Sequence, residues 1–155
     1  MAIELGISPD VVARRLASLP GVPNRLQRSR AEGGYLVLDD TFNANPAGAS
    51  HALDVLAAQA AGGRRVLVTP GMVELGNSQT AENAAFAEAA ARVVSDIIIV
   101  GRTNRAALLR GRARVVPGPA VELVQRREEA VDWARKRLGP NDAVLFENDL
   151  PDHFP

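Results

Sequence analysis

The sequence predicts an α/β protein, a Rossmann-like, doubly wound and mostly parallel sheet with helices on both faces. The first observation is a set of short, continuously apolar runs, YLVLDD, RVLVT, DIIIVG and AVLFEND, which is typical of strands buried on both faces. The second is that stretches of helical length separate these runs, as crossovers between parallel strands require. Right-handed crossovers then place helices on both faces of the sheet.

Composition excludes several functional classes. The chain has 155 residues, 18 basic and 18 acidic, and this zero net charge argues against a protein held to nucleic acid by charge. There is no cysteine, and only His51 and His153 could supply imidazole, so neither a thiolate nor a histidine-rich metal site is expected. No apolar run reaches the roughly 18 residues of a membrane span, and no secretory signal is present. We therefore expect a cytoplasmic globular domain.

The N-terminal part of the chain predicts a helix followed by a hairpin. Ser8 is a suitable N-cap for a helix that Pro20-Gly21 ends. RLQRSR (25–30) then alternates as an edge strand does, and the turn 32–34 leads into the strand YLVLDD.

A βα alternation follows. Helices are predicted from Pro46 to about Ala61, from Gln79 to Val94, from a cap at Thr103 to Gly111, and from Val121 to Leu138. The strands between them are RVLVT, DIIIVG, ARVV (113–116) and AVLFEND. The positions expected to face the core are Ala49, Leu53, Leu56 and Ala57 in the first helix and Phe86 and Ala90 in the second.

The segment DDTFNANP is the densest group of polar side chains at a predicted strand end, where such sheets bind ligands. Its carboxylates could accept from ribose hydroxyls, and its amides could hold a nucleotide or a peptide carboxylate. The same residue types are ordinary in turns, and Asn45 before Pro46 is a good N-cap. Both interpretations stay open. The candidates are Asp39, Asp40, Thr41, Asn43 and Asn45.

The other predicted edge loops are less informative. PGMVELG offers Glu74, but Met72 and its apolar neighbours could simply cover the sheet edge. Gly101 fits a plain strand-to-helix turn. The pairs Arg64-Arg65 and Arg126-Arg127 are interpreted as solvated surface.

Two common nucleotide motifs are absent from the sequence. The only lysine, Lys136, lies in a helical stretch, and no segment reads GxxxxGK[ST], so the chain has no phosphate loop. No GxGxxG follows a predicted strand, which disfavours a dehydrogenase.

DDTFNANP closely resembles the DDSYNANP signature of the Mur ligases, in the branch that adds D-alanyl-D-alanine. ALDVLA, RVLVTPGMVELG, DIIIVG and VLFENDLPD are similar to that branch in order and spacing, and the text from LGIS to LPGVPNRLQ resembles its interdomain join. The resemblance implies that residues 1–20 are the tail helix of a central ATPase domain that this chain does not contain. Residues 21–155 would then be a Mur ligase C-terminal domain.

The resemblance also implies a reaction, an ATP-dependent ligation in peptidoglycan biosynthesis. The carboxylate of a UDP-muramoyl tripeptide is phosphorylated by ATP, and the amine of D-alanyl-D-alanine attacks the acyl phosphate. In this family the central domain holds the phosphates and Mg2+, while the C-terminal domain closes over ATP and the amino substrate. The chain alone is therefore expected to be inactive, with no catalytic residue and no metal ligand of its own.

Individual positions take their implied roles from the same resemblance. Arg25 matches a linker arginine that reaches the ribose or phosphate of ATP, and Asp40 matches the aspartate at the ribose. Asn43 and Asn45 match amides that line the cleft near the phosphates, and Glu74 falls in the loop on the amino-substrate side.

Two departures from the family pattern are visible. Phe42 replaces the commoner tyrosine, and Pro70-Gly71-Met72 replaces Gly-Asp-Met, which argues against a catalytic carboxylate in that loop.

The alternative is a free-standing Rossmann-like binding or partner module without catalysis. An upstream reading frame with a phosphate-loop domain would support the ligase, and a natural start at Met1 would support the module. If the chain is a severed domain, the apolar set of the first helix should be exposed or covered by a neighbouring molecule. That set is Ile3, Leu5, Val12, Leu16 and Leu19.

Overall fold

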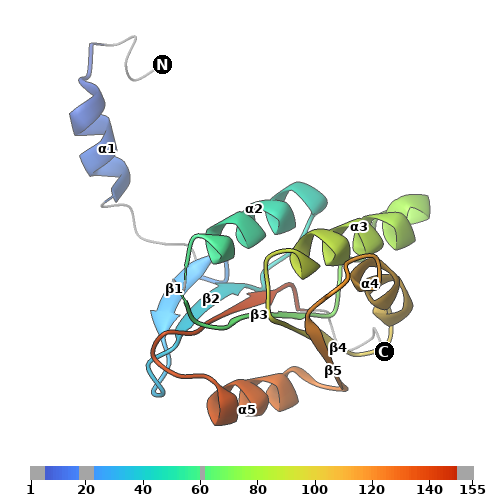
Figure 1. The fold of residues 1–155 in the computed structure, drawn as a ribbon. Helices are drawn as coiled ribbons and strands as arrows, with labels where there is room; N and C mark the ends of the chain where they lie inside the picture. Colours follow the sequence, from blue (N-terminus) through green and yellow to red (C-terminus); the bar gives the residue numbers. More distant parts are fainter. Residues whose placement is uncertain (1–5, 18–22, 60–61, 150–155) are drawn as a thin grey trace.

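A computed structural model describes residues 6–17, 23–59 and 62–149, and the last two of these ranges form one six-stranded sheet with helices against it (Figure 1). The strand order is β1-β2-β6-β3-β4-β5, and only the β1–β2 pair is antiparallel. This arrangement confirms the predicted fold class, including the hairpin of the first two strands. The strands are β1 (Gln27–Arg30), β2 (Leu36–Asp40), β3 (Arg65–Thr69), β4 (Asp96–Val100), β5 (Ala120–Val124) and β6 (Ala143–Glu147).

The helices are divided between the two faces by the direction of the chain. The crossovers from β2 to β3, β4 and β5 all proceed toward one edge of the sheet, whereas the last returns to the central strand β6. Right-handed connections therefore place the last helix on the opposite face from the others, as Figure 1 shows. These helices are α2 (Pro46–Ala57), α3 (Gln79–Ala91) after the short 3-10 turn η1 (Gly76–Ser78), α4 (Arg105–Arg112) and, opposite, α5 (Arg127–Arg137).

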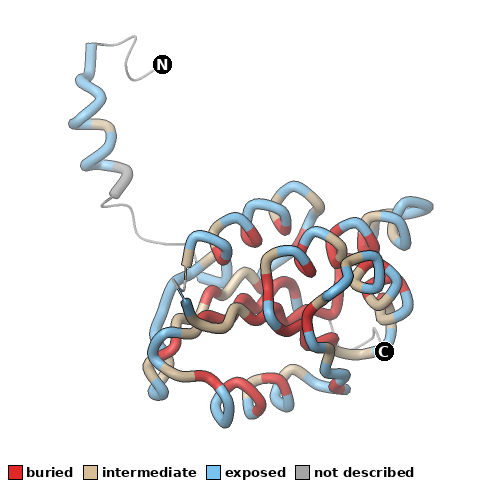
Figure 2. Tube along the Cα trace, viewed as in Figure 1, coloured by how far each residue is buried: buried red, intermediate tan, exposed pale blue. Residues whose placement is uncertain are grey.

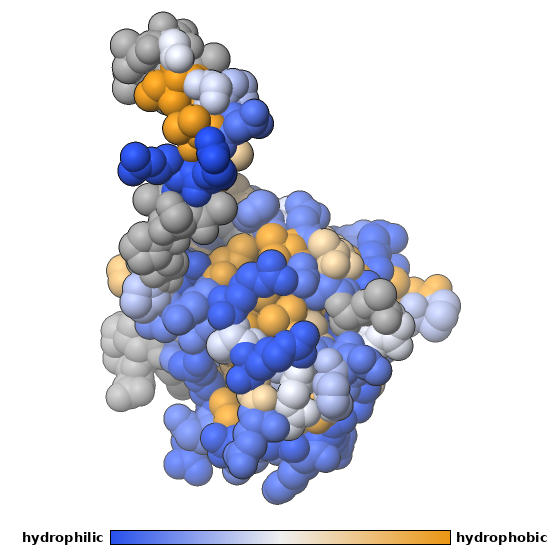
Figure 3. Space-filling model, turned by 90° about the vertical axis from the view of Figure 1, so that its left-hand side faces the viewer, coloured by the Kyte–Doolittle hydropathy of each residue, from blue (hydrophilic) through white to orange (hydrophobic). Residues whose placement is uncertain are grey.

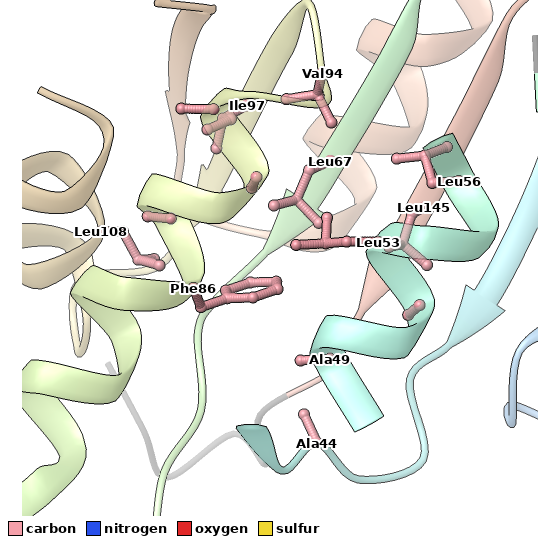
Figure 4. Packing of buried hydrophobic residues seen from close by; sticks show 14 of the residues in the cluster. Ala44, Ala49, Leu53, Leu56, Leu67, Phe86, Val94, Ile97, Leu108 and Leu145 are labelled. Atoms are coloured by element: carbon pink, nitrogen blue, oxygen red, sulfur yellow. The ribbon is translucent and has the colours of Figure 1, made fainter. Parts of the chain in front are cut away.

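Buried residues lie along the strands and on the helices of both faces (Figure 2). Each face of the sheet has its own core, and alternate residues of one strand belong to different cores. In β6, Leu145 packs toward α2 and α3, whereas Val144 and Phe146 pack toward α5. Figure 4 shows the first core, with side chains of α2 and α3 meeting those of β3 and β6. The predicted inward positions Ala49, Leu53, Leu56, Phe86 and Ala90 are buried, but Ala57, the last residue of α2, is exposed.

The prediction was wrong between α4 and α5. Residues 113–116 form no strand, and β5 occupies 120–124, where a helix was expected to begin. Arg112 donates through Nε to the carbonyl of Pro119 at 2.9 Å, so the intervening segment closes as a turn. β5 (AVELV) is an edge strand with mostly exposed side chains. Four of its five residues are apolar, but Glu122 interrupts the run, which the prediction placed at the start of the following helix.

α4 also differs slightly from the prediction. It begins at Arg105 with Asn104, not Thr103, at the N-cap position, and it ends at Arg112. Gly111 lies inside the helix, at a point where α3 is very close. A Cβ at this position would stand 1.9 Å from the carbonyl oxygen of Ala84. Glycine at this position allows the two helix backbones to touch.

The Arg64 side chain is 40% exposed and so is partly solvated as predicted, but it also makes specific contacts within the fold. Its guanidinium donates to both carboxylate oxygens of the buried Asp96, at 2.6 and 3.1 Å, and lies 5.1 Å from the centroid of the Trp133 ring. The Asp96 hydrogen bond raises the pKa of Arg64 above its ordinary value. Arg64 therefore stabilises the fold at the start of β3 and β4.

The helix α1 (Pro9–Ala17) stands apart from the sheet domain in Figures 1 and 3. Its predicted cap is present, since the Ser8 Oγ accepts from the Val11 amide at 3.4 Å. Apolar side chains gather on it: Ile7 and Val11 are 42% and 37% exposed, and Val12 is half-buried (Figure 3). Ile3, Leu5, Leu19 and the Leu16 side chain lie outside what the structure describes. Within the described ranges, no helix is long and apolar enough to cross a membrane.

Candidate functional site

Asp39 and Asp40 end the strand β2 and face opposite sides of the sheet. Asp40 follows Leu38 by two residues and so lies on the face covered by α2, where its Oδ1 accepts from the Leu26 amide at 2.9 Å. Asp39 accepts from the Thr41 hydroxyl at 2.6 Å and lies on the α5 face, 3.8 Å from Arg127. The two neighbouring carboxylates are therefore held on opposite faces of the sheet, and only Asp40 shares its face with α2.

Arg25 lies in a turn that is fixed to this loop at two points. Besides the Leu26–Asp40 bond, the Phe42 amide donates to the carbonyl of Asn24 at 3.0 Å. Asn24 and Leu26 both have positive φ, 58° and 49°, a conformation that these residues adopt only when their surroundings enforce it. The Arg25 guanidinium lies 4.4 Å from the centroid of the Phe42 ring, which is 61% exposed. The structure thus brings the predicted residues Arg25 and Asp40 together.

The two amides of the loop differ in their surroundings. Asn45 is the N-cap of α2: its Oδ1 accepts from the Gly48 amide at 2.9 Å, and Pro46 occupies the first helical position. The predicted capping role is confirmed, and the hydrogen bond to Gly48 occupies the carbonyl oxygen of the Asn45 side chain. Asn43 is exposed on the loop, ahead of the buried Ala44.

The second predicted loop, after β3, is held by buried asparagine side chains. Asn83 on α3 both accepts from the Met72 amide and donates to the Met72 carbonyl, each at 2.8 Å. Asn104, at the start of α4, donates to the Pro70 carbonyl at 3.1 Å. The loop is therefore bonded to α3 and to the start of α4, and these side chains satisfy the backbone groups of Pro70 and Met72.

Gly71, between these residues, is fixed from a third direction. Asn148, directly after β6, donates from Nδ2 to the Gly71 carbonyl at 2.7 Å. Gly71 has φ +80°, and a Cβ there would lie 2.4 Å from Asn83 Oδ1 and 2.7 Å from the Asn104 Cβ. Only glycine fits, which gives a physical reason for the departure from the family pattern at this position.

Glu74 lies further along the same loop and is exposed, with φ 63°. Met72 is buried, so it covers the sheet edge as the alternative interpretation predicted. A groove of about 230 Å³ between α2 and α3 is lined by Pro46 and by Met72, so the loops after β2 and β3 open onto the same face of the sheet. No described hydrogen bond links Glu74 to Asp40 or Arg25.

Glu147, which sequence reasoning did not single out, is a carboxyl group at the centre of this edge. It is completely buried, and within the part of the chain that the structure describes neither of its oxygens has a hydrogen-bond partner. In the parallel pairing of β2 and β6 it stands directly opposite Asp40. Burial first, and the Asp40 charge second, raise the pKa of Glu147 to about 8. A glutamate ending the apolar run AVLFE was the available signal.

Arg127 also departs from its predicted place on the surface, whereas Arg126 is exposed as expected. Its guanidinium lies 5.3 Å from the centroid of the Phe146 ring, and it pairs with Asp149 at 3.3 Å and Asp39 at 3.8 Å. Arg127 borders a groove of about 570 Å³ that lies along α5. That groove is on the other face of the sheet from Asp40.

The residues present fit a nucleotide better than a metal ion. A guanidinium and a half-buried carboxylate at the end of a parallel strand suit phosphate and ribose groups. In residues 6–17, 23–59 and 62–149, no cluster of three or more His, Cys, Asp or Glu side chains could hold a metal.

A parallel sheet with its polar loops gathered at the carboxyl ends of the strands defines a Rossmann-like ligand-binding domain. The chain belongs to the Mur ligase family: the model of the Mur ligase glutamate ligase domain matches residues 24–147.

Among curated proteins, the chain is similar to UDP-N-acetylmuramoyl-tripeptide–D-alanyl-D-alanine ligases. It is 35% identical to that of Escherichia coli over 107 residues, covering 68% of this chain and 23% of the relative. It is 34% identical to that of Mycobacterium tuberculosis H37Rv over 151 residues, covering 94% of this chain and 29% of the relative. The chain thus spans less than a third of the length of these relatives.

Solved structures agree with this assignment. A MurF crystal structure from Acinetobacter baumannii superposes with a TM-score of 0.71 at 26% identity, covering 95% of this chain and 31% of the other. The fold is also shared with a Thermotoga maritima MurF ligase in complex with ADP, with a TM-score of 0.74 at 22% identity over 96% and 32% of the two chains.

Proposed function

We propose that this chain is the C-terminal domain of an ATP-dependent ligase of peptidoglycan synthesis. The whole enzyme would join D-alanyl-D-alanine to a UDP-N-acetylmuramoyl tripeptide in the cytoplasm. The similarity to a UDP-N-acetylmuramoyl-tripeptide–D-alanyl-D-alanine ligase over 94% of the chain supports this substrate pair. Residues 1–20 would belong to the end of a preceding ATPase domain, and 21–155 to the closing domain.

The observation that carries the proposal is that hydrogen bonds hold the turn containing Arg25 against the loop that begins at Asp40. The Leu26–Asp40 hydrogen bond holds the Arg25 turn against the loop after β2. This places a guanidinium and a carboxylate at one edge, where they can bind the phosphate or ribose of ATP and the ribose hydroxyls, respectively.

The remaining candidates have more limited roles. Asn43 is exposed and can direct its amide toward the phosphates, whereas Asn45 has only its NH2 group to offer because its oxygen caps α2. Glu74 stands on a rigidly held loop and suits the ammonium group of the amino substrate.

Bound ATP would supply the phosphoryl group that activates the peptide carboxylate. This chain's part is to bind and orient the substrates and to exclude water when the domain closes. Magnesium would be held mainly by the ATPase domain.

The test is ligation by the full-length enzyme. Purified protein should release ADP and form the extended peptide only when ATP, Mg2+, the UDP-muramoyl tripeptide and D-alanyl-D-alanine are all present, as followed by mass spectrometry of the product. A panel of single amino acids and other dipeptides serves as the control. Product formed with one of those amines, and none with D-alanyl-D-alanine, would contradict the proposal.

A further inference from the structure

The end of the central strand β6 connects the two loops of the site. The Asn148 amide donates to the Asp40 carbonyl at 3.1 Å, and the Asn148 side chain donates to the Gly71 carbonyl at 2.7 Å. Asn148 has φ 66°, so it adopts an uncommon conformation in order to make both contacts. A displacement of Glu147, the residue before Asn148, therefore also displaces the Asp40 loop and the Gly71 loop.

That preceding residue, Glu147, lies on the same face of the sheet as Asp40. It follows Leu145 by two residues, as Asp40 follows Leu38, and both leucines belong to the core under α2 and α3. Strand pairing sets Asp40 and Glu147 opposite each other on adjacent strands. Two carboxyl groups thus lie side by side, one half-buried and one completely buried.

Within the described part of the chain, Asp40 is the charged group that shifts the pKa of Glu147, and Arg25, in the turn held beside Asp40, does not offset it. β2 contributes Asp40, and β3 ends in Thr69, which does not titrate and whose hydroxyl accepts from the Gly71 amide. α2 has no acidic residue in its first turn, and its His51 and Asp54 are exposed. In the loop after β3, Glu74 is exposed as well.

We propose that Glu147 is a positioning residue for nucleotide binding: its neutral carboxyl keeps Asp40 and the loop after β2 in place, and its ionisation displaces them. This inference rests on the proposed function, because it takes Asp40 to be the nucleotide-binding carboxylate. Two like charges on adjacent strands repel each other, and a charge without hydrogen bonds is expensive to bury. Both effects favour movement of the end of β6 once the proton leaves.

The same ionisation also acts on the ligand. A second negative charge beside Asp40 makes the local potential less favourable for the phosphates of a nucleotide. Displacement of Asp40 and repulsion of the phosphates therefore weaken binding in the same direction. The consequence is a loss of nucleotide affinity at alkaline pH that originates in a residue that does not touch the nucleotide.

The experiment has two readouts. In the 155-residue chain, the backbone amide resonances of Asp40 and Asn148 are followed by NMR against pH, in the wild type and in Glu147→Gln. In the full-length enzyme, the KM for ATP and kcat are measured over the same range. Glu122→Gln, an exposed glutamate on the edge strand β5, is the matched control.

We expect both amides to titrate together in the wild type, with a midpoint near the Glu147 pKa of about 8, and not in Glu147→Gln. The KM for ATP should rise up to about tenfold between about pH 8 and pH 9 in the wild type and in Glu122→Gln, because one proton is linked to binding. In Glu147→Gln it should stay flat, and near neutral pH it should equal that of the wild type.

A KM that rises equally in Glu147→Gln would overturn the proposal, as would an Asp40 amide that ignores the Glu147 titration. A full-length enzyme that uses no ATP, in a protein whose Asp40 amide still follows Glu147, would instead refute the proposed function. The coupling between the two carboxyl groups would then stand.

Discussion

Glu147 stands directly opposite Asp40 in the pairing of β6 with β2, so a completely buried carboxyl group lies beside the carboxylate that holds the Arg25 turn. Burial and the Asp40 charge raise the pKa of Glu147 from 4.5 to about 8. At pH values between 4.5 and about 8, Glu147 keeps its proton in the folded protein and releases it in the unfolded chain. The free energy of unfolding contributed by this group therefore falls as pH rises through that window and levels off above it.

Replacing Glu147 by glutamine should remove this dependence. The difference in unfolding free energy between about pH 5 and pH 8 should shrink by a few kcal/mol, as expected for a shift of this size. Urea unfolding at a series of pH values measures it, with Glu122→Gln as the control. An unchanged pH profile in Glu147→Gln would show that the carboxyl group is solvated in the folded protein.

Asp40→Asn should weaken nucleotide use without unfolding the domain. The amide oxygen can still accept from the Leu26 amide, so the turn should persist while the charge that orients the ribose is lost. We expect the KM for ATP of the full-length enzyme to rise about tenfold, the cost of one charge-assisted hydrogen bond. The exposed Asp54→Asn on α2 is the control. An unchanged KM with a clearly lowered Tm would instead assign Asp40 a purely structural role.

Phe42→Ala tests whether the exposed ring supports Arg25. The ring is 61% exposed, so the unfolding free energy should change by less than about 0.5 kcal/mol. The loss of an exposed cation–π contact, about 0.5–1 kcal/mol, should raise the KM for ATP about threefold. Val116→Ala, at a residue 88% exposed, is the comparison for stability and kinetics. Equal kinetics in the two variants would separate Phe42 from the site.

Asn83→Ala should destabilise the loop after β3. The side chain makes three hydrogen bonds, two to Met72 and one to the Gln79 carbonyl, and its loss leaves buried backbone groups without partners. We expect a loss of about 2–4 kcal/mol in unfolding free energy, measured by urea denaturation. Asn77→Ala, an exposed residue of η1, should change it little. If the two variants were equally stable, water would be satisfying the loop in place of Asn83.

The 155-residue chain by itself should neither hydrolyse ATP nor ligate. Its sequence has no phosphate loop, and the charged groups that the proposed site offers to the nucleotide are one guanidinium and one carboxylate, beside two neutral amides. A coupled ADP-release assay, with the full-length enzyme as the positive control, checks this. Magnesium-dependent turnover that disappeared in Asp40→Asn would contradict it.

The sequence by itself determined the elements whose signal is local. Buried parallel strands such as RVLVT and DIIIVG are apolar along their central residues. The pair Asn45-Pro46 supplies the N-cap and the first residue of α2. The strand ends then located the edge at which Asp40 and Glu74 stand. Arg25 was placed there by family resemblance, because its turn lies outside the βα series.

Only the tertiary structure decided the features that depend on distant neighbours. β5 is stabilised by pairing with β4 and by the Arg112–Pro119 contact, whereas its own sequence, AVELV, suits the start of a helix as well as a strand. Gly71 is dictated by asparagines from α3, α4 and β6, which are separated from it in the chain. In the sequence Glu147 is a polar residue at the end of a strand, but in the structure the neighbouring strands and the covering layer bury it completely. Burial and charge are set by what surrounds a residue in space, and no local pattern contains that information.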